Sequence, residues 1–380
     1  MEATMTAARR TRSWWLVPLV AVAATQALGL LVAVAVSANP VTDGLKWDAL
    51  RYLDIAERGY ELYPCPPGPI PYPLRPPDAW CGNAHWFPLY PLLIRGLHEV
   101  GLPYGAAGWL LSALALFAAF ALLWRLLGGR LTAVAAQCLA LAAALPGSTY
   151  FPLIFPVSLA LLAVVGLVTA LRARAWAWAG AAAALGAATY PSTGILVAIA
   201  PVAILLGFRH LSWAGRIWRA AGAGAIGAAA VVAVLATFQL TTGRWDAYLL
   251  IERNYGEGVH WPWATLWQVA TSGRLLDTAY LLSTLVILAV VVPAVVAGVR
   301  QGRRDGFDAP LWALLAMAAG FVLVPLVLGP AVAPHRSYAL LGAVVLLLVA
   351  VPERLRLILI AVSTGITVVL TGLFYAGVLI

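Results

Sequence analysis

Long runs of apolar residues, separated by short polar segments, follow one another along almost the whole chain. Runs of about 20 apolar residues match the thickness of a bilayer core and predict transmembrane helices. We expect about eleven helices, several of them short or interrupted by proline. Their expected ranges are 14–37, 105–124, 131–146, 152–171, 176–189, 192–207, 220–241, 277–299, 309–328, 338–351 and 357–379. The pattern predicts an all-α polytopic membrane protein, with residues 1–380 forming one integral membrane domain.

The amino-acid composition excludes the pair of soluble domains that the length of the chain would suggest. A chain of 380 residues would ordinarily hold two soluble domains, but 63% of its residues are hydrophobic and its mean hydropathy is +0.90. Residues 14–37 are too long an apolar run for the core of a signal peptide, so we interpret them as a first membrane helix behind a basic tail. The net charge of +9 is explained by arginines beside membrane helices, without a nucleic-acid partner.

The distribution of charge predicts the orientation. With the N-terminus in the cytoplasm, the expected cytoplasmic segments hold 15 of the 24 basic residues and 4 of the 15 acidic residues. This asymmetry follows the positive-inside rule and predicts a multi-pass protein of the plasma membrane.

Two connecting segments, residues 38–104 and 242–276, are far longer than the others and fall on the extracytoplasmic side of this topology. Connections of this length are usually functional or disordered, and their content of Trp, Tyr and charged residues opposes disorder. "WDALRYLDIAERGY" and "HWFPLYPLLIRGLHEV" in the first segment predict amphipathic helices along the membrane surface. We therefore expect the working face to be extracytoplasmic.

Asp48, at the start of the first of these helices, has two interpretations. An aspartate ahead of a helix is a favoured N-cap, and a carboxylate near the membrane surface is also a candidate general base. Asp48 and Asp54 would lie about 120° apart on a helix, which opposes a shared catalytic role. Asp54, Glu57 and Arg58 are typical of a solvated, ion-paired face.

The second long segment contains "RWDAYLLIERNYGEG", which repeats the Trp-Asp-Ala of the first. Its spacing differs, so we interpret Asp246 as the cap of a surface helix. In the first segment, Cys65 and Cys81 either form a disulfide in an oxidising compartment or remain free thiols.

The order of two motifs carries a family resemblance. "WDALRYLDIAERGY" followed by "WFPLYPLLIRGL" resembles the PIG-V family of GPI mannosyltransferases and its bacterial members. The matching positions are Trp47, Asp48, Ala49, Ile55, Ala56, Gly59, Tyr60, Phe87, Pro88, Leu89, Pro91 and Leu92. The chain departs from the family where Val157 stands at a glutamate position and Tyr190 at an arginine position.

The resemblance implies a GT-C fold with an outward-facing catalytic site. It implies inverting transfer of mannose from a polyprenyl-phosphate-mannose donor to a lipid-linked or glycan acceptor, with Asp48 as the key acidic residue. The partners would then be the bilayer, this donor and a glycolipid or glycan acceptor, without nucleic acid.

Transfer from such a donor needs a cation to stabilise the departing phosphate. Candidates on the outer side are Arg336 with His335, Arg253 with Arg244, His260, and Arg51. Snorkelling to lipid headgroups is the alternative for Arg336, and ion pairing with Glu252 or Glu257 is the alternative for Arg253.

Candidates to line the substrate pocket are Trp47, Asp54, Tyr150, Tyr190 and His260. Tyrosines of the membrane interface are the alternative for Tyr150 and Tyr190. The sequence has no clustered ligand set, so we expect no metal and no cofactor, although a divalent metal stays open. Two other functions stay open: a lipid or sugar transporter or flippase, and a non-catalytic partner of a glycosyltransferase.

Overall fold

The computed structural model describes residues 14–66, 78–255, 259–329 and 335–379. The basic tail at 1–13, most of the proline-dense segment at 67–77, and Glu257 lie outside the described residues.

Six described helices are long and apolar enough to cross a membrane. They are α2 (Leu16–Val36), α6 (Tyr104–Leu126), α11 (Trp213–Thr242), α14 (Leu275–Asp305), α15 (Ala309–Leu328) and α17 (Glu353–Tyr375). The chain is therefore an all-α, multi-pass membrane protein, as the apolar pattern predicts.

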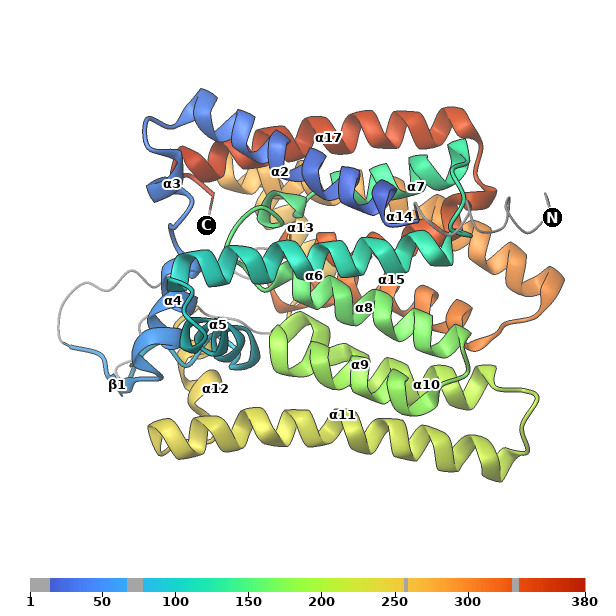
Figure 1. Ribbon diagram of the computed structural model, residues 1–380, viewed down its shortest axis with the longest axis horizontal. Coiled ribbons are helices and arrows are strands. Elements are labelled where there is room, and N and C mark those ends of the chain that lie inside the picture. The colour runs from blue at the N-terminus through green and yellow to red at the C-terminus, as the bar shows by residue number, and fades with distance from the viewer. Residues whose placement is uncertain (1–13, 67–77, 256–258, 330–334, 380) are drawn as a thin grey trace.

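Shorter apolar helices fill the space between the long ones. They are α7 (Ala133–Ala144), α8 (Val157–Arg172), α9 (Trp176–Thr189), η2 (Pro191–Ile195) with α10 (Leu196–Gly207), and α16 (His335–Tyr338) with the 3₁₀ helix η5 (Ala339–Ala350). Helix α8 is buried on almost every side, whereas α11 keeps much of its surface exposed at the edge of the bundle (Figure 1). The core is thus centred on α8 and its neighbours.

Polar side chains begin several of these helices. The hydroxyl groups of Thr132 and Ser212 and the carboxylate of Asp308 each accept a hydrogen bond from a backbone N–H in the first turn of α7, α11 and α15. Each cap satisfies an N–H group that has no partner within its own helix.

Short surface elements gather at one end of the bundle, which we call the capped end (Figure 1). From the first long segment it carries α3 (Pro40–Asp43), α4 (Asp48–Arg58) and α5 (Leu89–Glu99). From the second come α12 (Ala247–Glu252) and the short η3 (Arg253–Tyr255), followed by α13 (Pro262–Thr271). Helix α2 starts at the opposite end and α17 finishes at the capped end, where the Lys46 ammonium donates to the carbonyl of Tyr375 over 3.3 Å.

The two helices expected in the first segment are present, and both are amphipathic. Helix α4 buries Ala49, Tyr52, Ile55 and Ala56 on one face. The ring of Tyr52 meets Tyr90 of α5 edge-on, with centroids 5.1 Å apart. This spacing of i, i+3, i+6 and i+7 is that of one helical face.

Between α4 and α5 the chain forms a small hairpin, which the sequence reading did not predict. Strands β1 (Leu62–Pro64) and β2 (Trp80–Gly82) pair antiparallel, with Tyr63 opposite Cys81. Cys65 and Cys81 form a disulfide, which decides between the two interpretations of these cysteines. The proline-rich sequence between the two cysteines predicts an extended connector. In the structure the two ends of this connector pair as strands β1 and β2 and are cross-linked by the disulfide.

The two long segments pack against each other. The Asn254 side chain donates to the carbonyl of Trp80 over 2.6 Å. Nδ1 of His85 lies 3.0 Å from the Glu252 carboxylate, and the His85 ring stacks on Tyr248 at 5.7 Å. These contacts join both segments into one cap, as expected for ordered segments.

Candidate active site

A tight turn places Asp48 at the start of α4. The amide of Ala49 donates to the carbonyl of Lys46, and Trp47 between them has φ 56° and ψ −123°. These angles are those of the first central residue of a type II′ turn, a position that glycine dominates because a side chain is strained there. Strain of this kind is typical of functional sites, and here it fixes the residue next to the candidate base.

Asp48 does not cap α4 through its side chain. Trp47 occupies the cap position, and its side chain makes no capping hydrogen bond. The carboxylate of Asp48 instead accepts a hydrogen bond from Nη1 of Arg336 in an ion pair. The N-cap interpretation of Asp48 is therefore wrong, because the turn aims the carboxylate away from the helix N-terminus and at an arginine.

The ion pair is largely withdrawn from solvent, with the side chains of Asp48 and Arg336 14% and 13% exposed. The snorkelling alternative for Arg336 is accordingly not what the structure contains. A charge-assisted contact in such a place is stronger than one at a wet surface.

Aromatic rings surround the guanidinium of Arg336. Its central carbon lies 5.5 Å from the ring centroid of Tyr150 and 5.7 Å from that of Phe155. Tyr190 also interacts electrostatically with Arg336 and Asp48. The ion pair of Asp48 and Arg336 therefore interacts with both Tyr150 and Tyr190, which stand far apart in the sequence.

Tyr52 adds a protonated phenol on the side of Asp48. Burial raises the pKa of Tyr52 well above its ordinary value, and the negative charge of Asp48 raises it further. Both effects disfavour a second anion beside the carboxylate. Tyr52 therefore stays a neutral hydrogen-bond donor.

His335 contacts Tyr150, the tyrosine that lies beside the guanidinium of Arg336. It is fully buried, its Nε2 lies 2.6 Å from the hydroxyl of Tyr150, and its ring stacks on Tyr280 with centroids 4.7 Å apart. With Nε2 engaged by Tyr150, His335 holds Tyr150 in place. The expected direct contact of His335 with a phosphate is not favoured by this arrangement.

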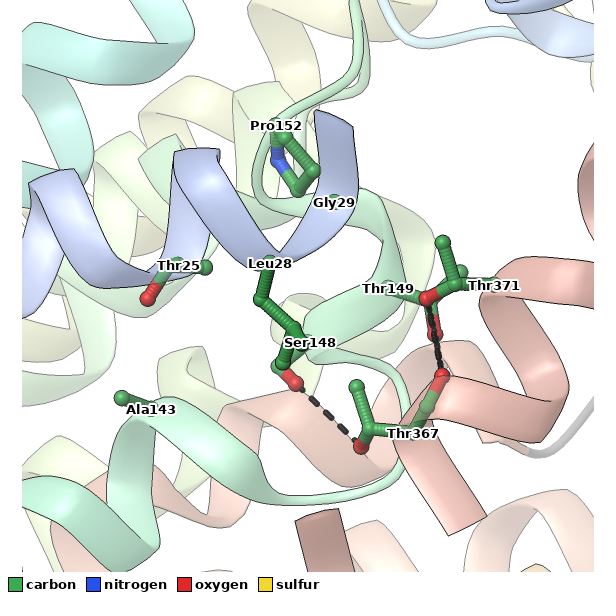
Figure 2. A pocket seen from close by; sticks show the side chains of 9 residues that line it. All are labelled: Thr25, Leu28, Gly29, Ala143, Ser148, Thr149, Pro152, Thr367 and Thr371. Carbon is green, nitrogen blue, oxygen red and sulfur yellow. Dashed lines mark hydrogen bonds between the residues drawn. The ribbon is translucent and has the colours of Figure 1, made fainter. Parts of the chain in front are cut away.

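The short helix η1 (Ser148–Tyr150), which carries Tyr150, is anchored by close packing and by hydroxyl groups. Gly147 has φ 93°, and a Cβ there would lie 2.2 Å from the carbonyl oxygen of His335. Figure 2 shows the hydroxyl groups of Ser148 and Thr149 turned toward Thr367 and Thr371 of α17, around a cavity of about 10 Å³. The hydroxyl of Thr371 donates to that of Thr149 over 3.2 Å.

The remaining arginine candidates have other partners. Arg51 lies over the ring of Trp86, with 5.8 Å between its central carbon and the ring centroid. Arg253 lies 3.4 Å from the carboxylate of Asp78, an acidic partner that was not expected. Arg244 forms a two-pronged pair with Asp246 at 2.9 and 2.8 Å.

Asp246 stands at the N-cap position of α12, but its carboxylate makes no capping hydrogen bond. Asp246 thus holds the expected N-cap position, but its carboxylate oxygens accept hydrogen bonds from Arg244 and none from the first turn of α12. The hydrogen bond from Arg244 also holds the pKa of Asp246 below its usual range. The aspartates of the two Trp-Asp-Ala segments thus pair with different arginines, Asp48 with Arg336 and Asp246 with Arg244.

Two expected pocket residues lie in other surroundings. Asp54 pairs with Arg58 and accepts a hydrogen bond from Asn83 over 3.3 Å, which confirms the expected ion-paired face. His260 packs against Gly329 and donates its amide hydrogen to the carbonyl of Val327 over 2.7 Å. Trp47 adjoins Asp48 in the turn and is 39% exposed.

The sequence reading missed the residues that complete the site. Tyr52 lies one helical turn after Asp48, so its spacing was an available signal. Phe155 and Tyr280 belong to membrane segments in which an aromatic residue is unremarkable, and nothing local distinguishes them. Ser192 and Ser337 join the flanks of the site through a 2.9 Å hydroxyl contact.

The described residues contain no group of three His, Cys, Asp or Glu side chains that could hold a metal ion. The chemistry that the arrangement offers is that of one carboxylate, one guanidinium and several phenols. Comparison of the sequence with family models and with curated proteins found no match.

Proposed function

We propose that the protein is a membrane glycosyltransferase of GT-C type, with about eleven membrane helices, that transfers mannose from a polyprenyl-phosphate-mannose donor. The acceptor is a glycolipid or glycan at the outer face of the plasma membrane. The observation that carries the proposal is the contact between Asp48 and Arg336. It joins the acidic residue of the family-like motif to an arginine suited to phosphate.

In this mechanism Asp48 removes the proton from an acceptor hydroxyl. The acceptor oxygen attacks C1 of the mannose as the bond from C1 to the phosphate oxygen breaks, which inverts the configuration. Polyprenyl phosphate leaves with the bonding electrons, and Arg336 stabilises its added negative charge. A donor with a single phosphate has no diphosphate to clamp, so the mechanism needs no metal.

The surroundings support this assignment of roles. Tyr150 and Tyr190 beside Arg336 offer rings and hydroxyls that suit a sugar. The location at one end of an apolar bundle lets an amphiphilic donor enter from the bilayer. The charge asymmetry of the sequence favours the capped end as the outer face, and the disulfide there suits an oxidising compartment.

The test uses the full-length protein in liposomes supplied with radiolabelled polyprenyl-phosphate-mannose and a lipid and glycan extract as acceptor. We expect label to move into the extract, and we expect Asp48→Asn to lower the rate by a factor of about 10²–10⁴, the usual contribution of a general base. Asp54→Asn is the matched control, because Asp54 belongs to the same helix but pairs with Arg58. The proposal fails if wild-type protein transfers no label, or if Asp48→Asn transfers at the rate of Asp54→Asn.

A further inference from the structure

Asp48 is already engaged by Arg336, and this conflicts with its role as a base. The lone pair of the Asp48 carboxylate that accepts a hydrogen bond from Arg336 cannot at the same time accept the proton of an acceptor hydroxyl. The same contact occupies a donor of Arg336 that a phosphate would need. In the structure, therefore, Arg336 occupies the carboxylate of Asp48 that would accept a proton, and Asp48 occupies a donor of Arg336 that would bind the phosphate.

We infer that the phosphate of the donor displaces Asp48 from Arg336, so that donor binding releases the catalytic base. The inference rests on the proposed function for the identity of the donor. It adds an order to the reaction, because an acceptor hydroxyl can lose its proton to Asp48 only after the donor is bound.

Arg336 is built to stay in place while its partner changes. Tyr150 and Phe155 flank the guanidinium within 5.7 Å, and His335 and Tyr280 pack behind Tyr150. Among the described residues, Nε of Arg336 is buried and has no hydrogen-bond partner. A phosphate presents several oxygens to the planar fork of an arginine, and it can therefore engage more than the Nη1 that Asp48 uses.

Asp48 has fewer constraints. Its carboxylate accepts a hydrogen bond from Arg336, and among the described residues no backbone N–H of the first turn donates to it. Repulsion from an arriving phosphate therefore acts on a side chain with little else to retain it. By contrast, Asp54 is retained by both Arg58 and Asn83.

This competition has a measurable consequence. A site that is open for only part of the time binds its ligand more weakly by that fraction. A pair that is closed for about nine-tenths of the time would weaken phosphate binding about tenfold. Removing the Asp48 charge should therefore strengthen binding of a phosphate ligand, although it lowers the rate of transfer.

The experiment measures binding of farnesyl phosphate, which carries no sugar, to the purified full-length protein in detergent by titration calorimetry. We expect Asp48→Asn to bind about tenfold more tightly than wild type, Asp54→Asn to bind like wild type, and Arg336→Gln to lose binding. Asp48→Ser is a second variant that removes the charge, in case the asparagine variant does not fold. Size-exclusion chromatography and thermal unfolding establish folding for each.

Equal or weaker binding by the Asp48 variants overturns the inference, as does an absence of binding by wild type and variants alike. The ligand cannot be a mannose donor, so the result is independent of transfer. Tighter binding without any wild-type transfer would support the displacement of Asp48 from Arg336 by a phosphate, but it would remove the proposed function and with it the role of Asp48 as a base. Transfer by wild type without tighter binding by the variants would do the reverse.

Discussion

Arg336 donates a hydrogen bond to Asp48 across 288 positions of sequence. Asp48 begins the surface helix α4, and Arg336 lies in the short helix α16, which follows α15 in the chain. A contact of this range depends on the packing of nearly the whole chain. It brings together the aspartate of the first motif and one of the arginines that the sequence offered as a candidate for phosphate binding.

Replacing Arg336 by lysine tests whether the guanidinium fork matters beyond its charge. We expect Arg336→Lys to lower kcat/KM for the polyprenyl-phosphate-mannose donor about 10²-fold, because lysine keeps one charge but cannot engage a phosphate with two parallel donors. Arg51→Lys is the control, since Arg51 lies over Trp86 and should leave transfer close to wild type. Equal rates for the two variants would contradict the role given to Arg336.

The apolar pattern predicted the helices well because membrane helices must satisfy their backbone hydrogen bonds internally and bury apolar side chains in lipid. The amphipathic α4 and α5 followed from spacing in the same way. The partner of Asp48 could not follow from spacing, since a local reading favours an N-cap at that position. Only the backbone of Trp47, whose unusual angles no pattern of residue types encodes, turns the carboxylate toward Arg336.

Other parts of the structure could not be predicted from the sequence, because they depend on how distant segments pack. Phe155 and Tyr280 are selected by where the membrane segments pack, and each would be acceptable in any apolar helix. The hairpin of β1 and β2 has strands of only three residues, too short for an alternating pattern to be recognised. The pairing of Arg253 with Asp78 likewise arises from contact between two segments that are far apart in the chain.

Backbone strain at Trp47 predicts that a glycine variant at this position is more stable than an alanine variant, the reverse of the usual order. Alanine normally stabilises a protein over glycine by about 0.4–1 kcal/mol through the unfolded state. At φ 56°, a Cβ is unfavourable, so we expect Trp47→Gly to be more stable than Trp47→Ala by about 1 kcal/mol. Thermal unfolding in detergent measures the difference. The same two substitutions at Trp178, an exposed residue within α9, should give the normal order; a shared order at both sites would contradict strain at Trp47.

The disulfide predicts that the capped end loses stability on reduction. The bond closes a loop between positions 16 apart in sequence, for which loop entropy corresponds to about 3 kcal/mol. We expect a reducing agent to lower the midpoint of thermal unfolding of wild type by several degrees. The double variant Cys65→Ala, Cys81→Ala should unfold at the lowered midpoint and show no response to the reducing agent. An equal response by both proteins would place the effect elsewhere.

Thr367 predicts a link between the middle of α17 and the chemistry at Tyr150. Its hydroxyl donates to the carbonyls of Ala144 and Leu145 at the end of α7, over 2.9 and 3.2 Å, just before η1 begins. Thr367→Val keeps the shape and removes the donor, so those carbonyls lose a partner in an apolar setting. We expect a loss of about 0.5–2 kcal/mol in stability, the range of polar contacts between membrane helices.

Because η1 carries Tyr150 toward Arg336, Thr367→Val should also lower the transfer rate at temperatures where the protein remains folded. The matched control is Thr237→Val on α11, a half-buried threonine whose hydroxyl, among the described residues, donates to the carbonyl of Ala233 in its own helix. That variant should leave both stability and transfer near wild type. If Thr367→Val lowers the unfolding temperature but leaves the transfer rate of the folded protein unchanged, the hydroxyl group anchors α7 without setting the position of Tyr150.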